Sequence, residues 1–321
     1  SKGVSTLITK QELEDFSYKS ATVTCKGCTA HCSLNVLTFA DGRRLISGNR
    51  CEKGAGIKID NPVENMIEYK YETILALEEK KPKTKPVAKV GFPLALNFYD
   101  LMPFFHKMLT SLGFEVVFSE QSTRDTYYKG QQTIPSDTVC YPAKITHGHI
   151  ESLLEKGVDF IFYPCMSYGV DEGQSDNHYN CPVVAYYPEL LKANMPNLNE
   201  DNFITPYLDL NIKTHVAKAV ARSLKKYGIT TKQVSEVLNK AWTAQVKYKN
   251  QICDKAQEII AEARAQNKKI IVLAGRPYHI DPEINHGIHK LITSLGFAVV
   301  TEDSVAELVD CPPLDVLNQW T

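Results

Sequence analysis

The sequence predicts an α/β protein built from repeated βαβ domains with mainly parallel sheets. From residue 86 onward, short apolar runs alternate with longer stretches of helical periodicity, and one stretch of nine residues occurs twice. Residues 109–117 (LTSLGFEVV) match residues 292–300 (ITSLGFAVV), and each copy follows an apolar run and a Gly-x-Pro turn. This alternation is typical of Rossmann-like or flavodoxin-like domains, and the repeat implies two of them.

The elements of the first domain follow from apolar spacing and from glycine and proline. Gly113 and Gly157 mark helix ends, and Pro142 stands at a favoured first helical position. We therefore expect strands at 87–92, 114–119, 158–163 and 183–187, and helices at 98–112, 143–156, 215–227 and 231–267. A fresh strand at 270–274 begins the second copy.

These patterns divide the chain into four parts: a cysteine-rich segment (1–60), a helix at about 63–70 with a linker (61–85), an α/β domain with a long C-terminal helix (86–265), and the start of a second repeat (266–321). The second copy stops about twenty residues after its second strand begins, whereas the first continues for roughly a hundred. We therefore expect a fragment of a longer chain.

Composition limits the partners. The 36 Lys and Arg nearly balance the 37 Asp and Glu, for a net charge of -1, so the chain lacks the basic footprint of a nucleic-acid-binding protein. No run approaches the roughly 18 apolar residues of a membrane span, and no signal peptide is apparent. We expect a cytoplasmic protein, in which the nine cysteines serve as metal ligands or redox groups rather than in disulfides.

A first cysteine set, Cys25-x-x-Cys28-x-x-x-Cys32 with Cys51 after a glycine-containing turn, predicts a four-thiolate metal site. A hairpin centred on Asp41-Gly42 joins its two halves. Residues 1–60 contain too few large apolar side chains for a core, so they need a bound metal to hold them together. Zinc and an iron-sulfur cluster both suit four thiolates; zinc is favoured because a closed shell needs no redox function.

A second set, Cys140, Cys165 and Cys181, lies at element boundaries of the α/β domain. Cys140 directly precedes a predicted helix, whose N-terminus favours a thiolate, and Cys165 follows a strand, where open α/β sheets bind ligands. Cys181 precedes the predicted strand 183–187, so this rule does not place it. From the pattern alone, the three fit either a shared site or separate buried thiols.

Several motifs resemble the 2-hydroxyacyl-CoA dehydratase group and its activase-related proteins. They are residues 134–144 (IPSDTVCYPAK), 147–149 (HGH), 162–165 (FYPC), 176–182 (DNHYNCP) and 275–279 (GRPYH), together with the N-terminal cysteines. The resemblance implies that Cys140, Cys165 and Cys181 hold an iron-sulfur cluster with one iron left open. It also implies low-potential electrons from an ATP-dependent activator, other domains of a full-length chain as partners, and an acyl-CoA or another small substrate.

The chain departs from the complete system because it lacks an ATPase motif such as Gly-x-x-x-x-Gly-Lys. Two alternatives to a redox module stay open: a non-catalytic, zinc-stapled scaffold or assembly module, and a thiol enzyme with Cys140 as nucleophile. His147 and His149 lie two apart on a helix, so we expect one to pack and the other to be solvated. Lys144 could balance the charge of a cluster.

Overall fold

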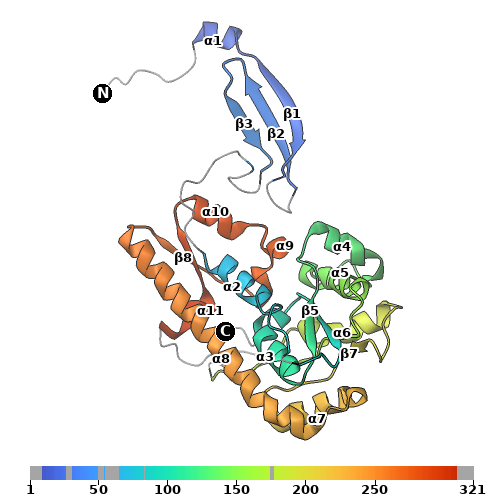
Figure 1. The fold of residues 1–321 in the computed structure, drawn as a ribbon. Coiled ribbons are helices and arrows are strands. Elements are labelled where there is room, and N and C mark those ends of the chain that lie inside the picture. Colours follow the sequence, from blue (N-terminus) through green and yellow to red (C-terminus); the bar gives the residue numbers. More distant parts are fainter. Residues whose placement is uncertain are drawn as a thin grey trace.

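The computed structural model describes residues 9–26, 31–49, 54, 65–82, 84–173 and 177–308. At the N-terminus, α1 (Lys10–Glu14) precedes an antiparallel sheet of β1 (Tyr18–Thr24), β2 (Ser33–Phe39) and β3 (Arg44–Ser47), in that order. This small sheet projects from the rest of the molecule (Figure 1). All seven residues of β1 are exposed, in keeping with the expected lack of a core. The predicted hairpin is present between β2 and β3.

The centre of the molecule is a parallel sheet with the strand order β5-β4-β6-β7. Its strands are β4 (Lys89–Phe92), β5 (Glu115–Phe118), β6 (Phe160–Phe162) and β7 (Phe203–Ile204). They alternate with α3 (Phe98–Ser111), α4 (Arg124–Gly130), α5 (Tyr141–Glu155) and α6 (Pro182–Asn194). The mixed α/β class and three of the four predicted strands of the first domain are therefore confirmed.

Helices cover both faces of this sheet, and two adjacent residues of β4 show how. A Cβ on Gly91 would lie 3.1 Å from Leu153 of α5. The next side chain, Phe92, packs edge to face on Phe98 of α3, with ring centroids 4.9 Å apart. Successive strand residues point to opposite faces, so α5 covers one face and α3 the other. The core between these helices and the sheet contains many aromatic side chains, and their burial makes a large apolar contribution to folding.

The prediction of a strand at 183–187 is wrong, because these residues belong to helix α6. Its buried residues include positions 184, 187, 188 and 191, which is the spacing of one helical face. Pro182 begins the helix, as a proline does at a first helical position. The continuous apolar run Val183–Tyr187 hid this periodicity in the sequence. The helix expected at 63–70 lies slightly later, as α2 (Met66–Leu75), with Asn65 as its N-cap.

The repeated sequence adopts the same local structure in both copies. In each, a helix ends at a glycine in the left-handed region, Gly113 (φ 94°) or Gly296 (φ 85°), and a strand follows. The second copy comprises the parallel pair β8 (Ile270–Leu273) and β9 (Ala298–Thr301), with α9 (Pro282–Asn285) and α10 (Ile288–Ser294) between them and α11 (Glu302–Val305) after them. Within the described residues the second sheet has only these two strands.

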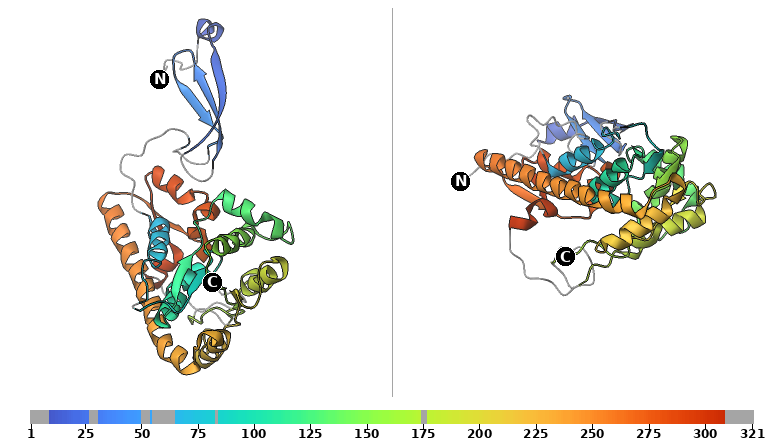
Figure 2. Two further views of the ribbon diagram at one scale, coloured as in Figure 1. Left: turned by 45° about the vertical axis from the view of Figure 1, so that its right-hand side comes forward. Right: turned by 60° about the horizontal axis from the view of Figure 1, so that its bottom comes forward.

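Two further helices link the parts of the molecule. They are α7 (Lys213–Ser223) and α8 (Thr231–Ala265), and short 3-10 turns lie at Gln131–Thr133, Lys225–Tyr227, Pro277–Ile280 and Ala306–Leu308. The 35 residues of α8 span about 52 Å. This helix contacts α3 and α7 of the first unit and β9 and α11 of the second, and Figure 2 shows it along one side of the molecule. Among the described residues, no helix is long and apolar enough to cross a membrane.

Candidate functional site at the carboxyl end of the parallel sheet

The three cysteines of the second set lie at one end of the central sheet. Cys140 is the N-cap of α5 and Cys181 is the N-cap of α6. Both helices run back from the carboxyl end of one strand to the start of the next, so both N-termini lie at the carboxyl end. Cys165 follows β6 at that same end, where its N–H donates to Pro206 O at 2.9 Å. Because residues 182–194 form a helix rather than a strand, Cys181 joins the other two at the ligand-binding edge typical of open α/β sheets.

The three thiols differ in their surroundings. Cys140 is exposed, Cys181 is half-buried and Cys165 is buried. Burial raises the pKa of the Cys165 thiol to about 12, and this thiol also interacts with the backbone of Glu189 and with Tyr207. Cys165 is therefore a neutral thiol at neutral pH, and a metal that binds there must displace its proton.

A residue from the second βαβ unit lies near this edge. Tyr278, in the turn after β8, is half-buried, and its pKa is raised by burial and by the nearby Cys140 and Cys181. Cys140 also contributes, after burial, to the raised pKa of Tyr187, whose hydroxyl lies 3.0 Å from Nε2 of His147. Tyr278 belongs to the GRPYH motif, but it lies 97 residues after Cys181 and 138 after Cys140, and this separation concealed their proximity in the sequence.

The three cysteines lie at the same edge of the sheet, but they are not arranged as the ligands of one metal ion. Nowhere in the described ranges do three or more His, Cys, Asp or Glu side chains converge as metal ligands do. The donor chemistry suits an iron-sulfur cluster, because thiols at two helix N-termini face the positive ends of two helix dipoles. The positions of the sulfur atoms are those of separate thiols, with Cys165 engaged by Glu189 and Tyr207.

The expectation that one of the two neighbouring histidines is solvated is wrong, since both are fully buried. His147 lies 2.8 Å from the Thr133 hydroxyl through Nδ1. His149 contacts the hydroxyls of Ser119 and Ser122 at 2.9 and 3.0 Å. The packing of α5 against α4 and α6 helps to bury both histidines, which the sequence spacing did not indicate.

A buried polar network continues from His149 into the second unit. Ser122 also donates to the carboxylate of Asp281, which accepts a further hydrogen bond from Tyr99 at 2.7 Å. Asp281 caps α9 by accepting from the N–H groups of Glu283 and Ile284 at 2.9 and 3.1 Å. All members of this network are at most 4% exposed or lie in buried backbone, so it joins the two units and is closed to substrates.

Buried histidines should make the fold sensitive to acid. Burial lowers the pKa of His149 from 6.5 to about 3, so the folded protein keeps this ring neutral where the unfolded chain binds a proton. Stability is then lost as pH falls below 6.5, by about 1.4 kcal/mol per pH unit for this group. We expect the free energy of unfolding in urea to drop between pH 7.5 and pH 4.5 by roughly 2–3 kcal/mol less in His149→Gln than in the parent. Equal drops in both proteins would contradict this assignment.

The first cysteine set is described only in part. Cys25 and Cys32 lie beside each other at the end of the β1–β2 pair where β1 ends and β2 begins, with the N–H of Cys25 donating to Cys32 O at 2.8 Å. Gly48, after β3, packs closely on the Ser33 backbone, so the chain leading to Cys51 returns to this same end. Cys28 and Cys51 lie outside the described residues, and the four-thiolate site stays a prediction.

Three other candidates have local partners. Lys144 donates to the backbone oxygen of Asp137 at 2.7 Å. The hydroxyl of Tyr141 donates to Glu283 of α9 at 3.0 Å, which adds a second contact between the two units. Tyr168 donates to the hydroxyl of Tyr179 at 3.1 Å on the exposed surface. These contacts account for the three side chains without a metal or a substrate.

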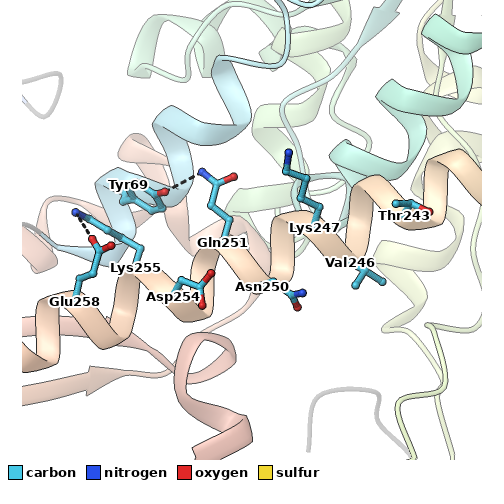
Figure 3. Close-up of a pocket in the computed structure, with 9 residues that line it drawn as sticks. All are labelled: Tyr69, Thr243, Val246, Lys247, Asn250, Gln251, Asp254, Lys255 and Glu258. Carbon is cyan, nitrogen blue, oxygen red and sulfur yellow. Dashed lines mark hydrogen bonds and ion pairs between the residues drawn. The ribbon is translucent and has the colours of Figure 1, made fainter.

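A hollow of the surface lies elsewhere, along α8 beside Tyr69 of α2 (Figure 3). Gln251 donates to the Tyr69 hydroxyl at 2.8 Å, and Lys255 pairs with Glu258 at 3.2 Å. The remaining lining is mixed polar and aliphatic, and it contains no cysteine or histidine. This hollow therefore has no chemistry in common with the cysteine edge.

A parallel sheet with helices on both faces, and with cysteines at the helix N-termini of its carboxyl end, places this protein in the α/β class. Residues 89–305 match the model of the CoA enzyme activase uncharacterised domain (DUF2229). The chain belongs to this family, which confirms the activase-related part of the resemblance. No curated protein and no solved structure matches the chain.

Proposed function

We propose that this protein is an iron-sulfur redox module of the 2-hydroxyacyl-CoA dehydratase type, with Cys140, Cys165 and Cys181 as protein ligands. The observation that carries the proposal is the placement of Cys140 and Cys181 at two helix N-termini of one sheet edge, with Cys165 at the end of the strand between them. Membership of the activase-related domain family supports it. The module receives electrons from an ATP-dependent activator protein or domain.

Each cysteine has a distinct part in this proposal. The unpaired N–H groups and dipoles of α5 and α6 would favour the negative charge of a cluster held by Cys140 and Cys181. Cys165 supplies a third ligand from the buried side once its thiol leaves Glu189 and Tyr207 and loses its proton. A cluster held by these cysteines would supply single electrons to a small substrate, such as a hydroxyacyl-CoA, for dehydration or reduction. Tyr278 of the second unit lies near Cys140 and Cys181.

The test is the metal content of the chain, purified anaerobically and reconstituted with iron and sulfide. We expect iron and sulfide in the parent protein and none in the triple variant Cys140→Ala, Cys165→Ala, Cys181→Ala, since each substitution removes a ligand. Cys253→Ala, on α8 far from the sheet edge in the sequence, is the matched control and should keep the iron. An iron content that is unchanged in the triple variant, or absent from all proteins, would sink the proposal.

The N-terminal cysteines support a second, structural role. Cys25 and Cys32 are neighbours across a hairpin, as two ligands of one tetrahedral ion need to be, and we propose that Cys28 and Cys51 complete a zinc site. Zinc measured in the same samples should persist in the triple variant. If zinc is the only metal in the parent, the chain is better described as a zinc-stapled assembly module of a larger protein.

A further inference from the structure

The outer edge of the N-terminal sheet is open to another strand. β1 lies at the edge of the order β1-β2-β3, and within the described residues no strand pairs with its other side. The sheet projects from the body of the molecule (Figure 2), and every residue of β1 is exposed. The opposite edge, β3, has only four residues and begins with Arg44. Short, charged edges resist pairing, whereas β1 has seven residues and one charge, on Lys19.

The hydrogen bonds of β1 show which of its residues face the open edge. The N–H of Cys25 donates to Cys32 O at 2.8 Å, and the N–H of Ala40 donates to Ser17 O at 3.3 Å. Residues of an antiparallel strand bond alternately to one side and to the other, so the odd-numbered residues of β1 bond to β2. The even-numbered residues direct their N–H and C=O groups outward; they are Tyr18, Ser20, Thr22 and Thr24. Such a row matches a second extended strand.

This row is complementary to itself. In an antiparallel pair of two β1 strands centred on Ala21, the methyl group of Ala21 faces its counterpart in the other copy. This central pair is of the closely spaced kind, with Cα atoms about 4.5 Å apart, which suits a small side chain. Ser20 of each strand then faces Thr22 of the other, so outward groups meet outward groups. The two Lys19 side chains lie four positions apart, about 14 Å along the strands, where salt screens their repulsion.

Charges beyond the two ends of β1 favour the same arrangement. Asp15 precedes the strand and Lys26 follows it, and both residues are exposed. An antiparallel pair brings Asp15 of one copy to the end that carries Lys26 of the other, and two-fold symmetry repeats this contact. A parallel pair would place like charges side by side, which is destabilising. The edge is therefore complementary in charge to a second copy of itself.

We infer that β1 pairs with β1 of a second copy of this chain, antiparallel and about a two-fold axis at Ala21, so that the two N-terminal sheets become one. In each copy the body lies at the end of β1 away from α1 (Figure 1), so the two bodies lie at opposite ends of the joined sheet. The pairing uses none of the thiols of the cysteine edge and is independent of the function proposed above. One strand per copy is a small contact beside the roughly 1,600 Å² of a standard interface. We therefore expect a reversible dimer with a dissociation constant on the order of 10–100 µM.

The inference is tested by sedimentation velocity of the whole chain between about 5 and 300 µM. We expect the mass to rise from that of a monomer toward that of a dimer. Thr22→Pro removes an outward N–H that β2 does not use, and proline is tolerated at such edge positions. It should weaken the dimer at least about tenfold, because the symmetric pair loses two donors. Thr22→Val keeps the N–H and a branched side chain, and it should dimerise as the parent does. A parent that stays monomeric at the highest concentration, or a Thr22→Pro variant that dimerises as well as the parent, would overturn the inference.

A charge exchange tests the orientation of the two strands. Asp15→Lys and Lys26→Asp should each weaken the dimer severalfold, because each places like charges beside one another across the interface. The double variant with both substitutions should recover the dissociation constant of the parent. The two residues lie at opposite ends of one strand, so contacts within a single copy do not explain such a recovery. Single variants that dimerise like the parent, or a double variant that stays weak, would refute the antiparallel two-fold pairing.

Discussion

Replacing Gly148 with alanine is expected to destabilise the α/β core strongly. Gly148 lies on α5 where this helix crosses α4, and a Cβ built on it would lie 2.6 Å from the carbonyl carbon of Thr126 and closer still to its oxygen. The facing residue of α4 is also a glycine, because a Cβ on Gly130 would lie 2.6 Å from the Cβ of His147. The two helices therefore pack backbone against backbone.

Two opposing effects decide the magnitude. Alanine is a better helix former than glycine by about 1 kcal/mol, which favours the substitution in an exposed helix. Here the added methyl group overlaps main-chain atoms, which cannot turn away as a side chain does, and overpacking of a core costs about 1–3 kcal/mol or more. The helices must separate, and the buried contacts of His147 and His149 are disturbed as well. We expect a net loss of about 3 kcal/mol or more, a large part of the roughly 5–15 kcal/mol of a typical domain.

Urea unfolding followed by circular dichroism measures this loss. Glu151→Ala, on the same helix but half-exposed, is the control and should change the free energy of unfolding by less than about 0.5 kcal/mol. If Gly148→Ala proves as stable as the parent, the backbone contact between α4 and α5 is not as described.

Removing the carboxylate of Asp281 should be nearly as damaging. This side chain is fully buried and accepts hydrogen bonds from the hydroxyls of Tyr99 and Ser122 and from two N–H groups of α9. Asp281→Ala leaves all four donors without this partner and opens space in a buried contact between the two units. Because each unsatisfied buried donor costs about 1–3 kcal/mol, we expect a loss of about 3–5 kcal/mol after relaxation.

Thermal unfolding of Asp281→Ala, Asp281→Asn and the parent separates the contributions. Asparagine keeps the shape and one acceptor oxygen, so it should lose roughly half as much stability as alanine. Asp254→Ala, at the open hollow of α8, is the exposed control and should melt with the parent. A melting temperature for Asp281→Ala within a degree of the parent would show that the network does not hold the units together.

Local signals in the sequence predicted most of the elements, and they did so where glycine and proline mark the ends. Gly113 and Gly296 need a left-handed backbone that other residues resist, so both helix ends were placed correctly. The run at 183–187 failed because a short, continuous apolar stretch suits a buried strand and a buried helix equally well. The length of this run does not distinguish a strand from a helix. The buried positions that continue to Leu191 show that it belongs to a helix.

The sequence predicted the position of a site residue only where that residue lies next to a helix or strand that the sequence also predicted. Cys140 and Cys165 were placed at the sheet edge from the helix and strand beside them, whereas Cys181 required α6 to be recognised as a helix. The approach of Tyr278 to Cys140 and the bond from Ser122 to Asp281 join residues more than a hundred positions apart. Such contacts depend on how complete units pack, which apolar periodicity does not encode.

Helix α8 limits where this fold can accept inserted residues. It is packed along its length against both βαβ units, so it leaves no hinge between them. Adding one residue within it would turn the second unit by about 100° and shift it by about 1.5 Å relative to the first. Surface loops can vary in length at little cost, but an insertion in α8 would move Tyr278 away from Cys140 and Cys181. The relative orientation of the two units is thus set by the number of residues in one helix.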